Sequence, residues 1–180
     1  QDDREQQKYV RKHRALAVTR NTKRQSREVA ENYLKARGLS VSLPSNALVE
    51  PASSDPQQGV AFPPRLVWPI LQTADSKRPF AGVHITSLMH DGSDKAHGKH
   101  SRKMEGVSKG GVVPFVDPAG DTVCITEGVE TALAIYELTG ERTWAALSAG
   151  GMASISVPDS VGEVIVCADN DAAGLDAAYK

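Results

Sequence analysis

The sequence predicts an α/β fold, in which a parallel sheet flanked by helices follows a small antiparallel β subdomain and an N-terminal helix. Two observations support this prediction. From residue 121 onward, short apolar β-branched segments alternate with segments of helical periodicity, which is typical of a parallel sheet with crossover helices. Between residues 60 and 117, apolar β-branched segments are separated by turn residues without helices between them, which favours antiparallel strands.

Length and composition exclude several classes of protein. The 180 residues, 40% of them hydrophobic and 24% charged, suffice for a buried core. No apolar run approaches the ~18 residues that cross a bilayer. The two cysteines, Cys124 and Cys167, exclude a disulfide framework and a cysteine-built zinc finger, and they favour a reducing, cytoplasmic compartment. Because the sequence does not start with Met, we expect it to be a fragment.

The first 64 residues divide into a basic helical segment and a linker. Residues 1–43 are basic; within them, residues 1–25 suggest a frayed helix or a linker. A short helix is predicted over residues 27–37, where Ser26 can cap the start and Gly38 can end the helix in a left-handed turn. Residues 44–64 contain five prolines and are predicted to form a linker.

The expected β subdomain spans residues 65–120. Candidate strands cover residues 65–70, 82–89 and 112–116. The polar, basic stretch 93–111 contains four glycines and predicts a surface loop. Trp68 lies in one of these strands and Trp144 lies in a later one, so both are expected in the core.

Residues 121–180 form the predicted parallel sheet. Its strands are expected over residues 123–126, 143–149 and 164–168, and its helices after residue 128 and from residue 172. Cys124 and Cys167 lie in central strands and are expected to behave as small apolar residues. The strands are apolar on both faces, as a sheet covered by helices requires. Because the chain ends within the last helix, we expect this sheet to be truncated at its C-terminal side.

The net charge of −1 conceals a gradient along the chain. Residues 1–41 carry eleven Lys and Arg against five Asp and Glu, whereas residues 121–180 carry two against ten. This asymmetry is typical of a basic arm for a polyanion beside an acidic region that holds cations. A solvated basic helix next to an ordinary acidic surface is the alternative.

Carboxylates follow two of the three predicted parallel strands. Glu127 follows the first strand, and Asp169 and Asp171 follow the third. Ligands of open α/β sheets gather at the carboxyl ends of the strands, so these side chains are expected to face one crevice. Clustered carboxylates favour a hard cation such as Mg²⁺ or Mn²⁺. Gly128 would allow close backbone approach there. Helix capping is the ordinary alternative for the two aspartates.

A basic stretch precedes this acidic region. Seven basic or histidine residues lie within fifteen positions: Lys95, His97, Lys99, His100, Arg102, Lys103 and Lys109. Such a loop could track a nucleic-acid backbone or grip triphosphates. A solvated loop without function is the alternative.

Two motifs carry a family resemblance. The segment Thr126-Glu127-Gly128 and the segment from Ala168 to Gly174 resemble the two signature motifs of the Toprim domain, which primases, topoisomerases and related nucleases share. The chain from about residue 27 onward resembles the DNA primases and primase-helicases of phages and plasmids. The run from Tyr33 to Leu39 is similar to the helix that opens the polymerase core of bacterial primases.

The resemblance implies a site and an activity. It implies that Glu127 is the general acid/base of nucleotidyl transfer and that Asp169 and Asp171 are Mg²⁺ ligands. The basic residues expected to contact nucleotide phosphates or template are Lys99, Arg102, Lys103 and Lys109. The expected function is divalent-metal-dependent synthesis of short primers on single-stranded DNA from nucleoside triphosphates during DNA replication, with a replicative helicase as a partner.

Two other functions stay open. A Toprim-type nuclease would break phosphodiesters with the same three carboxylates. A non-catalytic nucleic-acid-binding module derived from a primase is favoured by the shortened sheet and by the lack of an upstream zinc-binding module.

Overall fold

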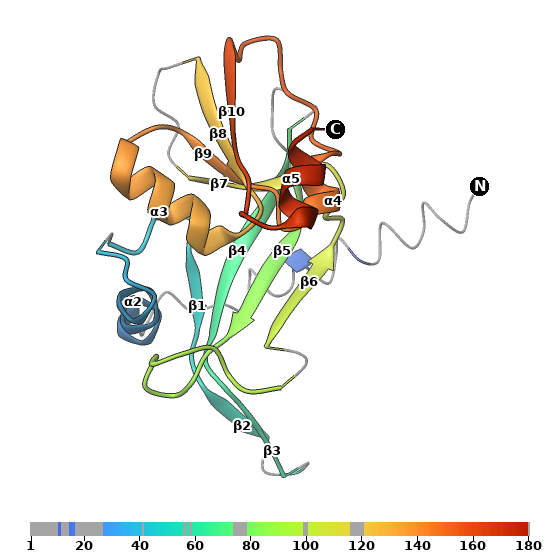
Figure 1. Ribbon diagram of the computed structural model, residues 1–180. Helices are drawn as coiled ribbons and strands as arrows, with labels where there is room; N and C mark the ends of the chain where they lie inside the picture. Colours follow the sequence, from blue (N-terminus) through green and yellow to red (C-terminus); the bar gives the residue numbers. More distant parts are fainter. Residues whose placement is uncertain are drawn as a thin grey trace, which may run out of the picture. The chain divides into compact units, whose positions relative to one another are not determined.

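The computed structural model describes residues 11, 15–16, 27–40, 42–55, 57, 59–73, 79–98, 101–115 and 121–179 (Figure 1). The expectation for residues 1–25 therefore lies almost entirely outside the described residues. The chain divides into two compact units, one of Gln1–Pro69 with Gly82–Gly106 and one of Ile70–Ala81 with Val107–Lys180. The fold is of the expected α/β class, with parallel and antiparallel strands and flanking helices.

In the first unit, helix α2 accompanies antiparallel strands. Its elements are α2 (Arg27–Ala36), β1 (Leu48–Glu50), β2 (Ser53–Asp55), β3 (Val60–Phe62), most of β4 (Arg65–Gln72), most of β5 (Phe80–Ser87) and β6 (Arg102–Gly106). β1 pairs with β4, β2 with β3, and β5 with β6, all antiparallel. The predicted linker 44–64 thus contains three strands and the predicted loop 93–111 contains β6, so both predictions were wrong. β2 and β3 form a local hairpin within the linker, whereas β1 and β6 are strands because they pair with β4 and β5.

Helix α2 buries three of its side chains in the core. Ala30, Tyr33 and Leu34 are at most 1% exposed. Gly38 follows the helix with a φ of 81°, which confirms the predicted left-handed end. The amide of Leu39 then donates a hydrogen bond to the Leu34 carbonyl (3.0 Å), which satisfies a carbonyl that the end of the helix leaves open.

A tight turn at Asp91 and Gly92 packs against α2. Asn32 Nδ2 donates a hydrogen bond to the Asp91 carbonyl (3.2 Å). Asp91 Oδ1 in turn accepts from both the amide and the hydroxyl of Ser93, and these hydrogen bonds lower the pKa of the Asp91 carboxyl. Gly92 has a φ of 75°, and a β-carbon there would lie 2.2 Å from the Val29 carbonyl oxygen. Only glycine lets the turn lie this close to α2.

The second unit contains the parallel strands. Its elements are the end of β4, the start of β5, β7 (Gly111–Phe115), β8 (Thr122–Thr126), α3 (Val129–Thr139), β9 (Thr143–Ala145), α4 (Ala149–Met152), β10 (Glu163–Cys167) and α5 (Ala172–Ala178). The strand order from β10 is β8, β9, β7 and then β4. β10, β8 and β9 are parallel, and β7 is antiparallel to β9 and β4. Figure 1 shows α3 on one side of the parallel strands and α4 and α5 on the other.

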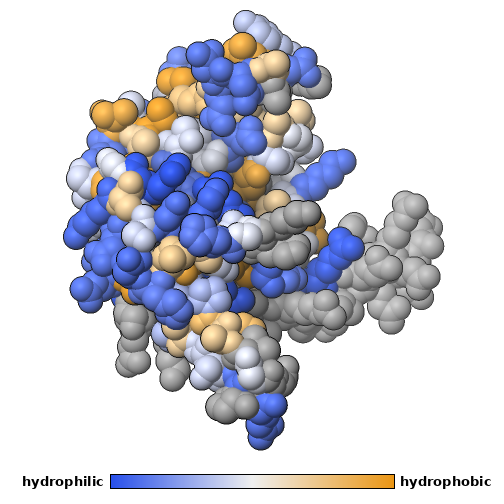
Figure 2. All heavy atoms as spheres, turned by 60° about the horizontal axis from the view of Figure 1, so that its bottom comes forward, coloured by the Kyte–Doolittle hydropathy of each residue, from blue (hydrophilic) through white to orange (hydrophobic). Residues whose placement is uncertain are grey.

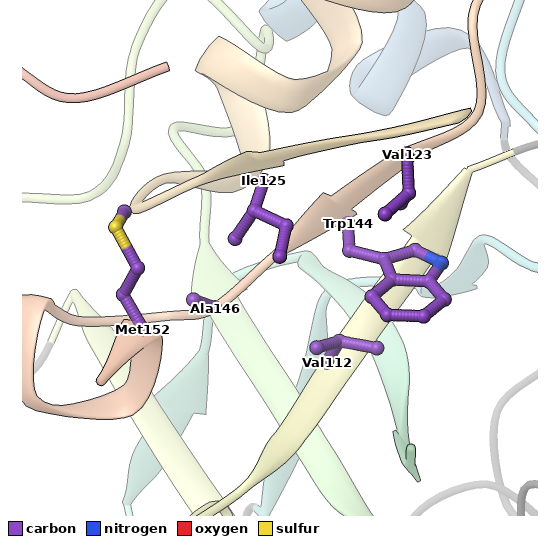
Figure 3. Close-up of a cluster of buried hydrophobic side chains, with 6 residues drawn as sticks. All are labelled: Val112, Val123, Ile125, Trp144, Ala146 and Met152. Carbon is purple, nitrogen blue, oxygen red and sulfur yellow. The ribbon is translucent and has the colours of Figure 1, made fainter. Parts of the chain in front are cut away.

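A cluster of buried side chains holds this sheet to α4. It consists of Val112, Val123, Ile125, Trp144, Ala146 and Met152. Figure 3 shows the Trp144 ring beside Val112 and Val123, with Met152 of α4 reaching toward the strands. Trp144 is fully buried and Trp68 of the first unit is 1% exposed, which confirms that both tryptophans are core residues. Burying one of the valine, isoleucine or methionine side chains of this cluster contributes about 1.5–3 kcal/mol to stability.

Strand β10 is less covered than its sequence predicts. Val164, Ile165 and Val166 are 40%, 42% and 39% exposed, although their apolar character suggested that helices cover both faces. β10 ends the strand order, and among the described residues its only partner strand is β8. The face in Figure 2 is mainly hydrophilic. Within the described residues, no helix combines the length and apolar character that a membrane crossing requires.

The contact between Gly92 and α2 can be tested with a matched pair of variants. Gly92→Ala meets both the left-handed conformation and the Val29 carbonyl, whereas Gly38→Ala meets only a left-handed conformation with no neighbour within 4 Å. We expect Gly38→Ala to lower the free energy of unfolding by about 1 kcal/mol and Gly92→Ala by about 3 kcal/mol. Urea unfolding followed by Trp68 fluorescence in a Trp144→Phe background measures both. Equal losses would contradict the docking role of Gly92.

Candidate functional site

Three parallel strands end level with one another in the second unit. Thr126, the last residue of β8, lies opposite Cys167 of β10 and Ala145 of β9. Glu127 follows β8 directly, and Asp169 comes two residues after β10. Because the carboxyl ends of adjacent parallel strands meet at one edge, Glu127 and Asp169 leave the sheet at the same edge.

The spacing of Asp169, Asp171 and Gly174 has a local structural cause. Asp171 is the N-cap of α5, and its Oδ1 accepts a hydrogen bond from the Gly174 amide (2.7 Å). The Asp171 amide donates to the Asp169 carbonyl (2.8 Å). A β-carbon on Gly174 would lie 2.5 Å from the same carbonyl oxygen. The glycine therefore lets α5 start directly against the backbone of Asp169, and this contact sets where Asp169 stands.

The three carboxylates do not form the single cluster that we expected. Within the described residues, no three His, Cys, Asp or Glu side chains gather closely enough to hold a metal ion. Asp171 explains part of this difference, because one of its oxygens is turned toward its own helix. The donor set still fits a hard ion, since Mg²⁺ takes one or two protein carboxylates and completes its shell with water and substrate phosphates. Asp169 and Asp171 are the residues that could hold such an ion.

Glu127 is half-buried and stands at the start of α3. On the other side of Glu127 in the sequence, the Gly128 carbonyl accepts a hydrogen bond from Thr126 Oγ1 (2.9 Å). Gly128 precedes the helix without a side-chain cap, and a β-carbon there would meet only Thr131 Oγ1, at 3.4 Å. The close backbone approach expected at Gly128 is therefore not found. Such approaches occur at Gly174 and Gly151 instead.

The turn after β9 is a part of this edge that the sequence did not reveal. β9 ends at Ala145, and the backbone turns sharply at Leu147, whose φ is 71°. Leu147 is the one non-glycine residue with positive φ in the described part of the chain. Its amide donates to the Glu127 carbonyl (2.8 Å), so this turn contacts the candidate site directly. In the sequence, the pair Gly150-Gly151 indicates that the predicted strand 143–149 ends, but it does not indicate the turn at Leu147.

The predicted basic residues are divided between the two units. Arg102 and Lys103 are exposed on β6 in the first unit, and Lys109 is exposed in the second. Lys99 lies outside the described residues. Lys103 Nζ is 3.1 Å from Glu105 Oε1, an exposed ion pair worth at most about 1 kcal/mol. Successive residues of a strand face opposite sides, so Arg102 lies on the face away from this pair.

The two cysteines lie diagonally on neighbouring strands. Cys124 pairs with Ile165, so Cys167 is offset by two residues on the same face. Their side chains are close enough to hydrogen-bond with each other. Burial raises the pKa of the Cys124 thiol, and neighbouring Cys167 adds to the shift. Cys124 is 3% exposed and so behaves as the predicted small apolar residue, whereas Cys167 is half-buried.

This arrangement predicts unequal thiol reactivity. Cys124 combines burial with a raised pKa, so little of it is thiolate at pH 8, and the thiolate is the reactive form. We expect iodoacetamide to modify Cys167 of the folded protein about tenfold faster than Cys124. Peptide mass spectrometry over a time course measures the two rates. Comparable rates would contradict the burial of Cys124.

The capping role of Asp171 can be separated from its charge. Asp171→Asn keeps an oxygen that accepts from the Gly174 amide, whereas Asp171→Ala removes it. We expect Asp171→Ala to lower the free energy of unfolding by about 1 kcal/mol and Asp171→Asn to lower it by less than half as much. Urea unfolding followed by Trp144 fluorescence in a Trp68→Phe background is the measurement. An equal loss in both variants would show that the carboxylate charge, and not the cap, stabilises this end of α5.

Comparison with known protein families covers most of the chain. Residues 122–180 match the Toprim domain, and this match confirms the part of the resemblance that the two acidic motifs carried. Residues 10–115 match a family described as Domain of unknown function (DUF7146). Searches of curated proteins and of solved structures gave no match. Toprim domains bind divalent metals and are compatible with primase-type or nuclease-type enzymes that act on nucleic acids. Because the upstream match spans more than half of the chain, the protein belongs to the DUF7146 family, and it carries a Toprim domain after that region.

Proposed function

We propose that this chain is the catalytic core of a primase-type nucleotidyltransferase, which makes short primers on single-stranded DNA from nucleoside triphosphates with Mg²⁺ or Mn²⁺. The observation that carries the proposal is the level ending of β8 and β10, which brings Glu127 and Asp169 to one edge of the Toprim sheet. A replicative helicase that supplies unwound template is the proposed protein partner.

The proposed reaction is an in-line displacement at phosphorus. The 3′-hydroxyl oxygen of the growing primer bonds to the α-phosphorus of the incoming triphosphate, and the bond from that phosphorus to pyrophosphate breaks. Glu127 accepts the proton that the hydroxyl loses. Asp169 and Asp171 are the residues that would hold the divalent ion, and Asp171 Oδ1 also caps α5. When bound, the ion orients the triphosphate and offsets the negative charge that develops on it.

The division of charge between the two units supports a polyanionic substrate. The first unit carries sixteen Lys and Arg against ten Asp and Glu, and the second carries five against twelve. A net charge of +6 suits a nucleic-acid backbone, and a net charge of −7 suits bound cations. Arg102 and Lys103, which are exposed on β6, are the proposed contacts to that backbone.

The proposal predicts a specific loss of primer synthesis. Glu127→Gln removes the proton acceptor and Asp169→Asn removes a charged ligand, so each is expected to lower synthesis by about 100-fold or more. Matched controls are Glu141→Gln and Asp159→Asn, which change exposed carboxylates of the same unit. The assay supplies single-stranded DNA, ribonucleotides or deoxyribonucleotides, and Mg²⁺ or Mn²⁺, and it resolves short products on a gel.

The same assay distinguishes the other functions. Cleavage of the template without synthesis, lost in both site variants, would select a nuclease. Binding of single-stranded DNA with neither product would select a non-catalytic module. Primers that persist in both site variants would contradict the assignment of Glu127 and Asp169.

A further inference from the structure

Two successive amides at the end of β9 point to the same neighbouring strand. The Ala146 amide donates to the Thr126 carbonyl and the Leu147 amide donates to the Glu127 carbonyl, both at 2.8 Å. In a regular parallel ladder, successive amides of one strand point to opposite neighbours, so an extended Leu147 would direct its amide away from β8. The left-handed conformation of Leu147, with a φ of 71°, accompanies this reversal. The additional hydrogen bond ends on the peptide of Glu127.

Contacts on the far side of the turn hold this conformation in place. Ser148 Oγ accepts a hydrogen bond from the Gly151 amide (2.9 Å), and the Ser148 carbonyl accepts one from the Met152 amide (2.9 Å). A β-carbon on Gly151 would lie 2.2 Å from the Ala146 carbonyl oxygen, so α4 returns against β9 as closely as glycine allows. Leucine disfavours positive φ, and such a conformation persists only where its surroundings determine it.

The peptide units on either side of this contact are also held. The Glu127 carbonyl accepts from the Leu147 amide, and the next carbonyl, that of Gly128, accepts from Thr126 Oγ1 at 2.9 Å. These two hydrogen bonds limit rotation of the backbone that carries the Glu127 side chain. The Leu147 contact is the one of the two that depends on an unfavourable backbone conformation.

We propose that Leu147 is a positioning residue for Glu127. Its left-handed conformation lets the chain continue into α4 while its amide points at the Glu127 carbonyl, and this hydrogen bond fixes the direction in which the Glu127 side chain leaves β8. The inference rests on the proposed function, because it concerns the residue to which that function assigns the proton transfer. What Leu147 contributes is its backbone conformation and not its hydrophobic side chain.

Two substitutions separate backbone from side chain. Leu147→Val keeps an apolar side chain but is β-branched, and β-branched residues reject positive φ most strongly. Leu147→Gly removes the side chain but adopts positive φ freely. We expect Leu147→Val to lower kcat for primer synthesis about tenfold or more with KM for the nucleotide within about twofold, and Leu147→Gly to stay within about threefold of the wild type. Leu138→Val in α3, where the leucine is 81% exposed, is the matched control.

If the leucine side chain has only a structural role, the activities of the two variants rank in the opposite order. If Leu147 only fills space, the valine variant keeps its activity and the glycine variant loses it, and this result would overturn the proposal. Circular dichroism verifies that all three variants are folded.

A second measurement does not depend on activity. Amide hydrogen exchange at residue 147 is expected to stay slow in the wild type and in Leu147→Gly, and to be about tenfold or more faster in Leu147→Val. If the wild type makes no primers, the proposed function fails and this exchange rate alone decides the positioning role. Equal exchange in the two variants would then refute it.

Discussion

The parallel hydrogen-bond register between β8 and β10 is the constraint on which the site depends. Five consecutive residue pairs fix this register, from Glu163 opposite Thr122 to Cys167 opposite Thr126. Because side chains alternate along a strand, a slip by one residue would turn every side chain of β10 to the other face. The level ends of β8 and β10 follow from this register. The places where Glu127 and Asp169 leave the sheet are therefore determined by strand pairing and do not require contacts between the two carboxylates.

The turns after β9 and β10 use glycine to bring a helix close to the strand that precedes it. Gly151 lies against the Ala146 carbonyl after β9, and Gly174 lies against the Asp169 backbone after β10. A side chain that caps the helix accompanies each glycine, Ser148 in α4 and Asp171 in α5. The turn after β8 differs, since Gly128 has neither a close backbone neighbour nor a capping side chain. The backbone of Glu127 is held instead from the neighbouring turn at Leu147.

Sequence reasoning found what periodicity and apolar character determine. The strands that precede Glu127 and Asp169, the helix after Gly128 and the core tryptophans follow from the alternation of apolar segments. The Toprim motifs follow from residue identity. β6 was missed because Arg102 and Lys103 suggest a loop, and only pairing with β5 makes the segment a strand. Leu147 was missed because leucine has no preference for positive φ. Its conformation is a consequence of neighbours that sequence alone does not reveal.

The two family matches and the two compact units divide the chain at different places. The upstream match ends at residue 115 and therefore includes β7, yet β7 belongs to the second unit, where it pairs with β9. Val112 of β7 lies in the cluster with Trp144 (Figure 3), so the Toprim core is completed by a strand from outside the Toprim match. Without that strand, β9 would expose one edge and the largest side chain of the cluster would lose part of its cover. The turn at Leu147 follows β9 directly, and so the geometry around Glu127 rests on residues of both families.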